Sequence, residues 1–181
     1  MTYYGAKELA EAFKTVRKNT IQIAEDIPED KYSFKAAPDV RSVGELLAHI
    51  ALSPTFQLEF HGNTSAGFEN FNFMALFERL SADMAKPRTK AQVIELLRSE
   101  GEKFASFVGG LSDDFLGETL TMPPGGTPSQ RVRIDMIMSV KEHEMHHRGQ
   151  LMLIERMLGI VPHLTKQQQE RMARMQQQQR N

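Results

Sequence analysis

Apolar residues recur along much of the chain at steps of three and four, which is the spacing of one face of an α-helix. The first such stripe covers residues 6–25 and includes Leu9 and Phe13. Ile27 and Pro28 follow it, and a residue that precedes proline is driven out of the helical region. The pattern therefore predicts a first helix over residues 6–25 that ends at this dipeptide.

A second helix is predicted to begin at Ser42, where the residues Ser-Val-Gly-Glu at 42–45 match a capping box. In a capping box the Ser oxygen and the Glu carboxylate satisfy backbone N–H groups that the helix start leaves free. Apolar residues continue as far as Leu58, and Pro54 is expected to kink the helix near its middle. His49 lies on this otherwise apolar helix.

Two further long helices are predicted. The residues Thr-Lys-Ala-Gln at 89–92 form a second capping box, and the apolar positions behind it predict a third helix that ends at Gly109. The longest periodic segment, residues 134–158, predicts a fourth helix that Gly159 ends. Between the second and third helices, residues 74–79 predict only a short helical turn.

The segment between the third and fourth helices is the least helical part of the chain. Residues 122–128 are rich in Pro and Gly and predict a tight loop, with short extended pieces expected near Thr119 and Arg131. Four long helices without clear alternating strands predict an all-α fold, a four-helix bundle with long connecting loops. We assign residues 1–164 to this bundle and residues 165–181 to a polar, Gln-rich C-terminal tail, expected to be a surface helix or partly disordered.

Composition and charge narrow the range of functions. The net charge of -1 gives no field that would attract nucleic acid or an acidic membrane surface, and no basic stripe interleaved with aromatic residues appears. The chain has neither a spanning apolar run nor the apolar stretch of a signal peptide. Cysteine is absent, which excludes thiolate metal sites and a cysteine nucleophile. We therefore expect a cytoplasmic protein that binds neither nucleic acid nor a membrane.

Two histidines of the fourth predicted helix carry the clearest chemical signal. His143 and His147 are four residues apart and fall on the same apolar stripe as Val140 and Leu151, whereas His146 lies about 100° away around the helix. Two imidazoles on a core-facing stripe are costly to bury without partners, and a divalent metal ion would satisfy both. The alternative is a partly exposed bundle end with hydrogen-bonded histidines.

His49 is the candidate for a third ligand, because helical bundles often build metal sites from side chains on facing helices. Taken alone, it reads more simply as a satisfied core histidine. Three imidazoles would leave a coordination position open, which is typical of a catalytic site, and the ion would lower the pKa of a bound water or thiol. Imidazole ligands point to Zn or Ni first, with Fe or Mn as alternatives.

Two segments resemble the DinB-like superfamily, which includes the YfiT-like and thiol-transferase proteins. The matching pieces are residues 42–50, around the first histidine, and residues 143–151, which contain the more specific run His-His-Arg-Gly-Gln. In layout the resemblance extends over residues 5–160, and the Gln-rich tail after Thr165 departs from the family pattern.

The resemblance implies a four-helix bundle with a histidine triad that binds a metal ion, carried over here to His49, His143 and His147. It also implies a homodimer and, by analogy with several members, a thiol-dependent transferase or isomerase that uses bacillithiol, mycothiol or glutathione. The expected function is thus metal-dependent activation of a low-molecular-weight thiol or of water, for transfer to a small-molecule substrate or for its hydrolysis.

Three neighbours of the histidines are candidate site residues. Glu144 is a candidate general base or partner of a metal ligand, and the alternative is an exposed helix carboxylate. Arg148 is a candidate for bidentate binding of a substrate carboxylate, and the alternative is a salt bridge along or between helices. Gln150 is a candidate for hydrogen bonding to a bound cofactor or ligand, and otherwise it caps a polar layer.

Two other functions remain open. Residues 143–147 match H-E-x-x-H, the zinc protease motif, but the extended form needs Gly at 150 and His at 153, where this chain has Gln150 and Leu153. The second rival is a non-enzymatic, stress-related helical binding module in which the metal ion is structural. That reading rests on analogy between folds alone.

Overall fold

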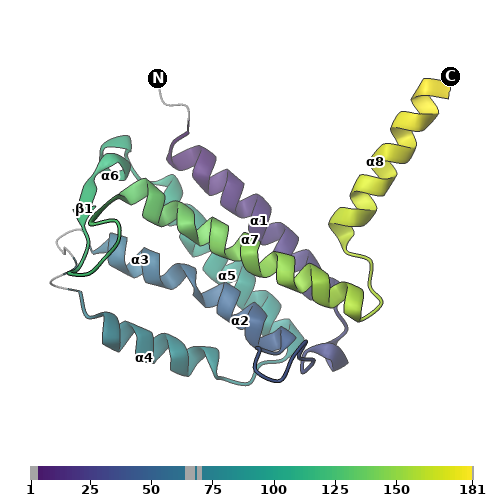
Figure 1. The fold of residues 1–181 in the computed structure, drawn as a ribbon, viewed down its shortest axis with the longest axis horizontal. Coiled ribbons are helices and arrows are strands. Elements are labelled where there is room, and N and C mark those ends of the chain that lie inside the picture. The colour runs from purple at the N-terminus through teal and green to yellow at the C-terminus, as the bar shows by residue number, and fades with distance from the viewer. Residues whose placement is uncertain (1–3, 64–67, 69–70, 181) are drawn as a thin grey trace.

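A computed structural model describes residues 4–63, 68 and 71–180. Its bundle, shown in Figure 1, consists of α1 (Ala6–Asp26), α2 (Val43–Leu52) followed by α3 (Pro54–Gly62), α5 (Lys90–Gly109) and α7 (Arg133–Met157). These four helical segments are the ones that the apolar periodicity predicts. The all-α four-helix bundle is confirmed.

Local sequence signals set the ends of these helices. At the start of α2 the Glu45 N–H donates to the Ser42 hydroxyl over 3.3 Å, and the Ser42 N–H donates to the Glu45 carboxylate over 2.7 Å. Thr89 and Gln92 make the equivalent pair of bonds at the start of α5. Pro54 is the first residue of α3, so the proline divides the predicted second helix into α2 and α3. Both capping boxes and the interruption at Pro54 are confirmed.

The helix α4 (Phe73–Met84) corrects the expectation of a short turn over residues 74–79, because it is 12 residues long. Asn72 caps it by accepting the Ala75 N–H over 3.0 Å, and Leu76 and Leu80, one turn apart, bury its inner face. Its outer face is largely exposed, and α4 lies along the outside of the bundle beside α2 in Figure 1. The apolar residues Phe73, Leu76, Phe77 and Leu80 follow the helical spacing i, i+3, i+4 and i+7, so the sequence did carry a signal for the longer helix.

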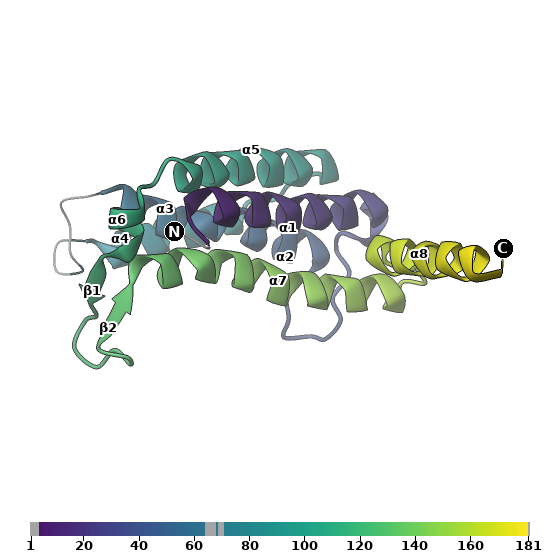
Figure 2. The ribbon, with the colours of Figure 1, turned by 90° about the horizontal axis from the view of Figure 1, so that it is seen from above.

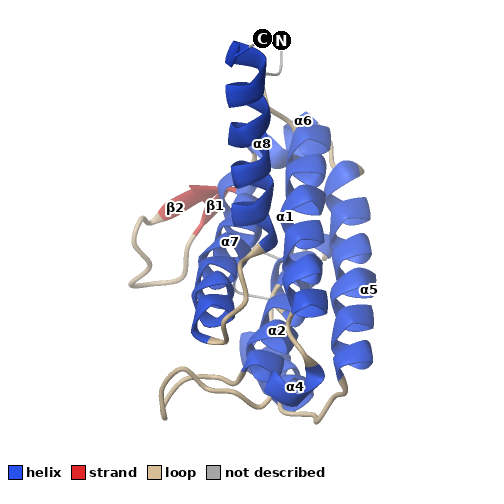
Figure 3. Cartoon of the chain, turned by 90° about the vertical axis from the view of Figure 1, so that its right-hand side faces the viewer, coloured by secondary structure: helices blue, strands red, loops and turns tan. Residues whose placement is uncertain are grey.

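The connection between α5 and α7 contains a short helix and a hairpin. After α6 (Asp113–Gly117), β1 (Thr119–Thr121) pairs antiparallel with β2 (Gln130–Val132), which places Leu120 opposite Arg131. The hairpin lies at one end of the bundle in Figure 2, and its two strands are red in Figure 3. The extended pieces predicted near Thr119 and Arg131 are therefore confirmed. A short 3-10 helix, η1 (Glu29–Lys31), follows α1.

The C-terminal tail is the helix α8 (His163–Arg180). It begins two residues before the predicted boundary at 165, and its helical form replaces the partly disordered alternative. The first residues of α8 lie against α1, with His163 buried, and the rest extends past the end of α7 in Figure 2. Among the described residues, none of the helices combines the length and apolar character that crossing a bilayer requires.

The core consists of two apolar clusters with a polar layer between them. One cluster contains Phe13 and Val140, and the other contains Ile23 and Leu151. Between these levels, α1 and α7 carry the buried polar side chains Arg17, Thr20 and Glu144. These three polar side chains share one level along the axis of the bundle, and other buried polar side chains, such as His61 and Glu155, lie elsewhere. The predicted metal ligands of α7 lie at the level of Arg17, Thr20 and Glu144 too.

Candidate metal centre

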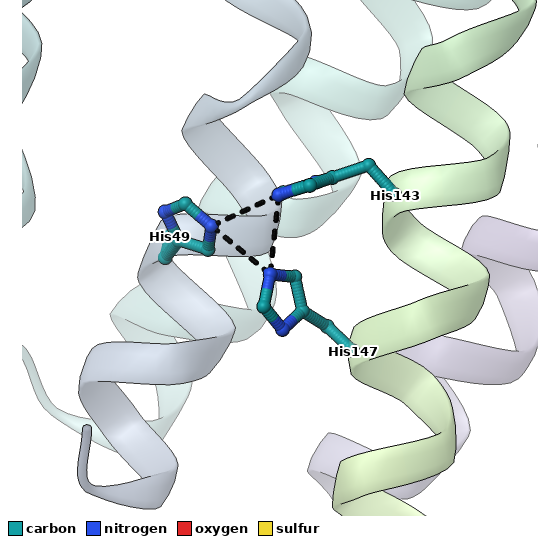
Figure 4. A group of neighbouring side chains, drawn as sticks. All are labelled: His49, His143 and His147. Carbon is teal, nitrogen blue, oxygen red and sulfur yellow. Dashed lines mark hydrogen bonds between the residues drawn. The ribbon is translucent and has the colours of Figure 1, made fainter. Parts of the chain in front are cut away.

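The side chains of His49, His143 and His147 converge between two helices, as Figure 4 shows. His49 comes from α2, and the other two come from successive turns of α7. The three Nε2 atoms are 3.2 Å, 3.2 Å and 3.1 Å apart. The structure therefore brings together all three histidines that the sequence singles out. The set could hold a metal ion.

The three Nε2 atoms are arranged better for coordinating a divalent ion than for hydrogen bonding to one another. A hydrogen bond needs an N–H on one nitrogen and a lone pair on the next, so three Nε2 atoms in mutual contact cannot all be satisfied among themselves. Tetrahedral coordination with bonds of ~2.0–2.1 Å separates two ligand nitrogens by about 3.3 Å. The observed separations of 3.1–3.2 Å are close to that value. A shared cation would therefore use all three lone pairs at once.

The surroundings of the triad keep its imidazoles neutral. Burial is the main cause that lowers the pKa of His49 to about 4, and the positive charge of Arg41 contributes to the same shift. Burial likewise lowers the pKa of His143 to about 4, with the neighbouring histidines and Arg41 adding to the effect. The pKa of His147 is lowered for the same first reason. At neutral pH the three rings are uncharged, which is the form that binds metal ions.

Gln150 acts on the triad through His147. The Nδ1–H of His147 donates to the Gln150 Oε1 over 2.8 Å, and the Gln150 amide donates to Nε2 of the exposed His146 over 3.3 Å. Because the proton is held on Nδ1, the Nε2 lone pair of His147 is free to face the other two rings. The sequence suggested a contact between Gln150 and a bound ligand. The hydrogen bond between Gln150 and His147 could have been predicted from their spacing, because residues three apart on a helix lie side by side.

Glu144 is buried on a different side of α7, and its side chain is directed at α1. It is 2% exposed, so its interpretation as an exposed carboxylate is wrong. Its two oxygens accept hydrogen bonds of 3.0 Å and 3.1 Å from Nε of Arg17, and one of them accepts a third of 2.9 Å from Nη2. His143 and His147 point instead at α2. The structure therefore does not bring Glu144 to the triad as a general base.

The position of Glu144 also bears on the H-E-x-x-H motif. In such a protease the Glu between the two histidines must reach the metal-bound water. Here both carboxylate oxygens of Glu144 are held by Arg17. The local geometry thus gives the protease interpretation no support.

Arg148 lies one turn after Glu144, on the side of α7 that faces α1 and α8. It is half-buried, and its charge lowers the pKa of His163 at the start of α8. Within residues 4–63, 68 and 71–180 it forms no ion pair, so the salt-bridge alternative is not observed. The structure does not bring Arg148 to the triad.

A cavity of about 780 Å³ lies beside the triad. His147, Gln150, Leu153 and Ile154 of α7 form one wall. The rest of the lining comes from the loop that precedes α2, from the first turn of α2 and from the end of α4, and it includes Lys35, Asp39, Arg41, Glu45 and Leu46. Of the three triad histidines, His147 lines this cavity, and His49 and His143 do not.

Sequence reasoning missed two charged residues, Arg41 in the lining of the cavity and Arg17 in the bundle interior. Arg17 stands among the apolar positions of the first predicted stripe, and that position was a signal for burial. Arg41 lies in a loop, where no periodicity exists to assign it a face. Its role becomes visible only when the loop is placed beside α7.

The chain matches the family model described as the DinB superfamily over residues 12–151. It is 26% identical over 157 residues to YjoA of Bacillus subtilis (strain 168), which covers 85% of this chain and 91% of that protein. The crystal structure of the DinB-like protein YjoA from Bacillus subtilis has a TM-score of 0.61 at 24% identity, covering 84% of this chain and 92% of that one. A DinB-like protein from Bacillus cereus ATCC 10987 has a TM-score of 0.66 at 16% identity, covering 89% and 97%. The two structures share the fold of this chain.

Proposed function

We propose, from the premise that this chain belongs to the DinB superfamily, that it is a metal-dependent enzyme whose histidine triad activates a thiol or water for reaction with a small molecule. The convergence of three neutral imidazoles, of which that of His147 belongs to the lining of a cavity, is the observation that carries this proposal. A buried structural ion would need no such access. An ion at the wall of a cavity can exchange water for substrate.

The metal ion would be held by Nε2 of His49, His143 and His147, with Zn or Ni as the first candidates and Fe or Mn as alternatives. When bound, the ion supplies Lewis acidity, which lowers the pKa of a coordinated thiol or water. Gln150 keeps the proton of His147 on Nδ1. Arg17 holds Glu144 on the other side of α7 and so fixes the rotation of the helix that carries two ligands.

The cavity wall supplies the other half of the site. Leu46, Leu153 and Ile154 offer apolar surface to a substrate, and Gln150, which holds His147, lies in the same lining. We propose a low-molecular-weight thiol as co-substrate in a transfer reaction and water as nucleophile in a hydrolysis. The homodimer and the cytoplasmic location expected from the sequence stay predictions. Light scattering of the purified protein and cell fractionation would test them.

Metal analysis of the purified protein tests this function. Wild-type protein should bind about one equivalent of Zn²⁺ or Ni²⁺, and the variants His49→Ala, His143→Ala and His147→Ala should each lose it. His146→Ala is the matched control, because this histidine is adjacent to the triad and exposed. The metal-loaded protein is then assayed for thiol conjugation to 1-chloro-2,4-dinitrobenzene and for ester hydrolysis. Bound metal with neither activity would favour the non-enzymatic module, and no bound metal would contradict the proposal.

A further inference from the structure

We propose that Arg41 is the anion-recognising residue of the cavity beside the triad, so that the substrate or co-substrate carries a carboxylate. The carboxylate would bind the Arg41 guanidinium while another atom of the same molecule reaches the triad. This proposal deepens the proposed function and rests on it for the reaction that follows binding. Arg148, which the sequence suggested for this role, lies on another side of α7.

The placement of Arg41 is the first observation behind this proposal. It immediately precedes Ser42, the capping residue of α2, and it lines the same cavity as His147 and Gln150. Its side chain is exposed and makes no hydrogen bond or ion pair with another described residue. The five N–H groups of its guanidinium are therefore available to a ligand in the cavity.

The second observation is the charge balance of the cavity wall. Lys35 lies 3.7 Å from the Glu45 carboxylate, which also accepts the Ser42 N–H, so this cation and this anion offset each other. Asp39 is exposed on the same loop. Arg41 is therefore the cation of this lining that has no anionic partner within the described residues.

The number of free cations favours a carboxylate over a phosphate. A single guanidinium matches a singly charged carboxylate in a bidentate geometry. A doubly charged phosphate would need a second free cation, and Lys35 in the same lining is already paired with Glu45. The apolar side chains of Leu46, Leu153 and Ile154 fit the uncharged body of such a molecule. The cavity volume of about 780 Å³ suits a small metabolite.

Matched pairs of probes test the proposal. The full-length protein loaded with Co²⁺ is titrated with 4-mercaptobutanoate and with 4-mercaptobutanamide, which has the same size and no charge. Thiolate binding is followed by the sulfur-to-cobalt absorption band. We expect the acid to bind about tenfold more tightly than the amide. Arg41→Gln should abolish this preference while the metal content stays unchanged.

Lys35→Gln is the matched control, because Lys35 lies in the same wall and is already paired with Glu45. It should keep the preference for the acid. Equal binding of both probes to the wild type, or a preference that survives Arg41→Gln, would overturn the role of Arg41.

A second experiment distinguishes failure of the role proposed for Arg41 from failure of the proposed function. If neither probe produces the absorption band, thiol activation at the triad fails. The role of Arg41 is then decided on the metal-free protein by NMR titration with butanoate and butanamide. Chemical-shift changes beside Arg41 with butanoate alone, lost in Arg41→Gln, would support anion recognition, and their absence would refute it.

Discussion

Arg17 holds both carboxylate oxygens of Glu144 through hydrogen bonds of 2.9–3.1 Å in the interior of the bundle. The same guanidinium donates to the backbone oxygen of Leu97 over 2.7 Å and to that of Ile50 over 3.3 Å. One side chain of α1 thus contacts α2, α5 and α7. Gly101 leaves room for it, since an added Cβ there would lie 2.9 Å from the Arg17 Cγ. Ile50 and Glu144 each neighbour a triad histidine, so this network sets the level at which α2 and α7 face each other.

The first prediction concerns this buried pair. Arg17→Met should lower the free energy of unfolding by about 3–5 kcal/mol, because it leaves the Glu144 carboxylate buried without its cation. The double variant Arg17→Met/Glu144→Leu should recover much of that loss, since an apolar pair avoids the cost of burying either charge. Urea unfolding followed by circular dichroism measures both. Lys14→Met, in an exposed pair on the same helix, should change stability by less than about 0.5 kcal/mol. An Arg17→Met protein as stable as the wild type would contradict the prediction.

The second prediction concerns Gln150. Gln150→Ala should weaken metal binding by about 10- to 100-fold, because His147 loses the acceptor that keeps its proton on Nδ1. Gln150→Glu should bind metal more tightly than Gln150→Ala, since a carboxylate is a stronger acceptor for the same N–H. Competition against a chromophoric chelator measures the affinities. Gln167→Ala, on the exposed surface of α8, serves as control. Unchanged affinity in Gln150→Ala would show that the hydrogen bond does not tune the site.

Structural features that depend on only a few consecutive residues could be predicted from the sequence. The capping boxes at Ser42 and Thr89 involve hydrogen bonds between residues three apart, so four letters of sequence suffice to predict them. The stripe that contains His143 and His147 is local in the same sense. His49 could be placed on a helix from its own segment, the habit of bundles to build metal sites between facing helices made it a candidate ligand, and the family resemblance added the full triad.

Features that depend on which elements meet could not be predicted in this way. Periodicity places Glu144 on a face of its helix, but it does not say that Arg17 of α1 lies opposite. The interpretation of Glu144 as exposed was wrong for this reason. Arg41 belongs to a loop without a pattern, and its charge matters only because the loop folds over α7. Each of these contacts joins residues distant in sequence.

The third prediction concerns how the stability of the metal-free protein changes at acid pH. Burial lowers the pKa of His143 from 6.5 to about 4 in the folded state. Below pH 6.5 the unfolded chain takes up a proton that the folded protein does not, so stability is lost as the pH falls from about 6.5 to about 4. His143→Ala should therefore lose less stability than the wild type between pH 7 and pH 5. Urea titrations at both pH values test this, with exposed His146→Ala as control. Identical losses in wild type and His143→Ala would contradict it.

The fourth prediction concerns Glu155 of α7. Its contribution to stability changes with pH in the opposite direction to that of His143. Its side chain is 0% exposed, and neither carboxylate oxygen has a hydrogen-bond partner within the described part of the chain. Burial, together with the negative charge of Asp26, raises its pKa from 4.5 to about 7. The folded protein therefore keeps a proton that the unfolded chain releases. The resulting stabilisation is complete below pH 4.5 and is lost as the pH rises through about 7.

Glu155→Gln removes this ionisation while keeping the size of the side chain. At pH 8 the variant should be more stable than the wild type by about 1–3 kcal/mol, since no charge has to be buried. At pH 5, where the wild-type carboxyl is already protonated in the folded protein, the difference should shrink. Glu142→Gln, on the exposed side of α7, should show no such change between the two pH values. A Glu155→Gln protein that is destabilised equally at pH 5 and pH 8 would mean that the carboxyl group of Glu155 is held in a form that the amide cannot replace.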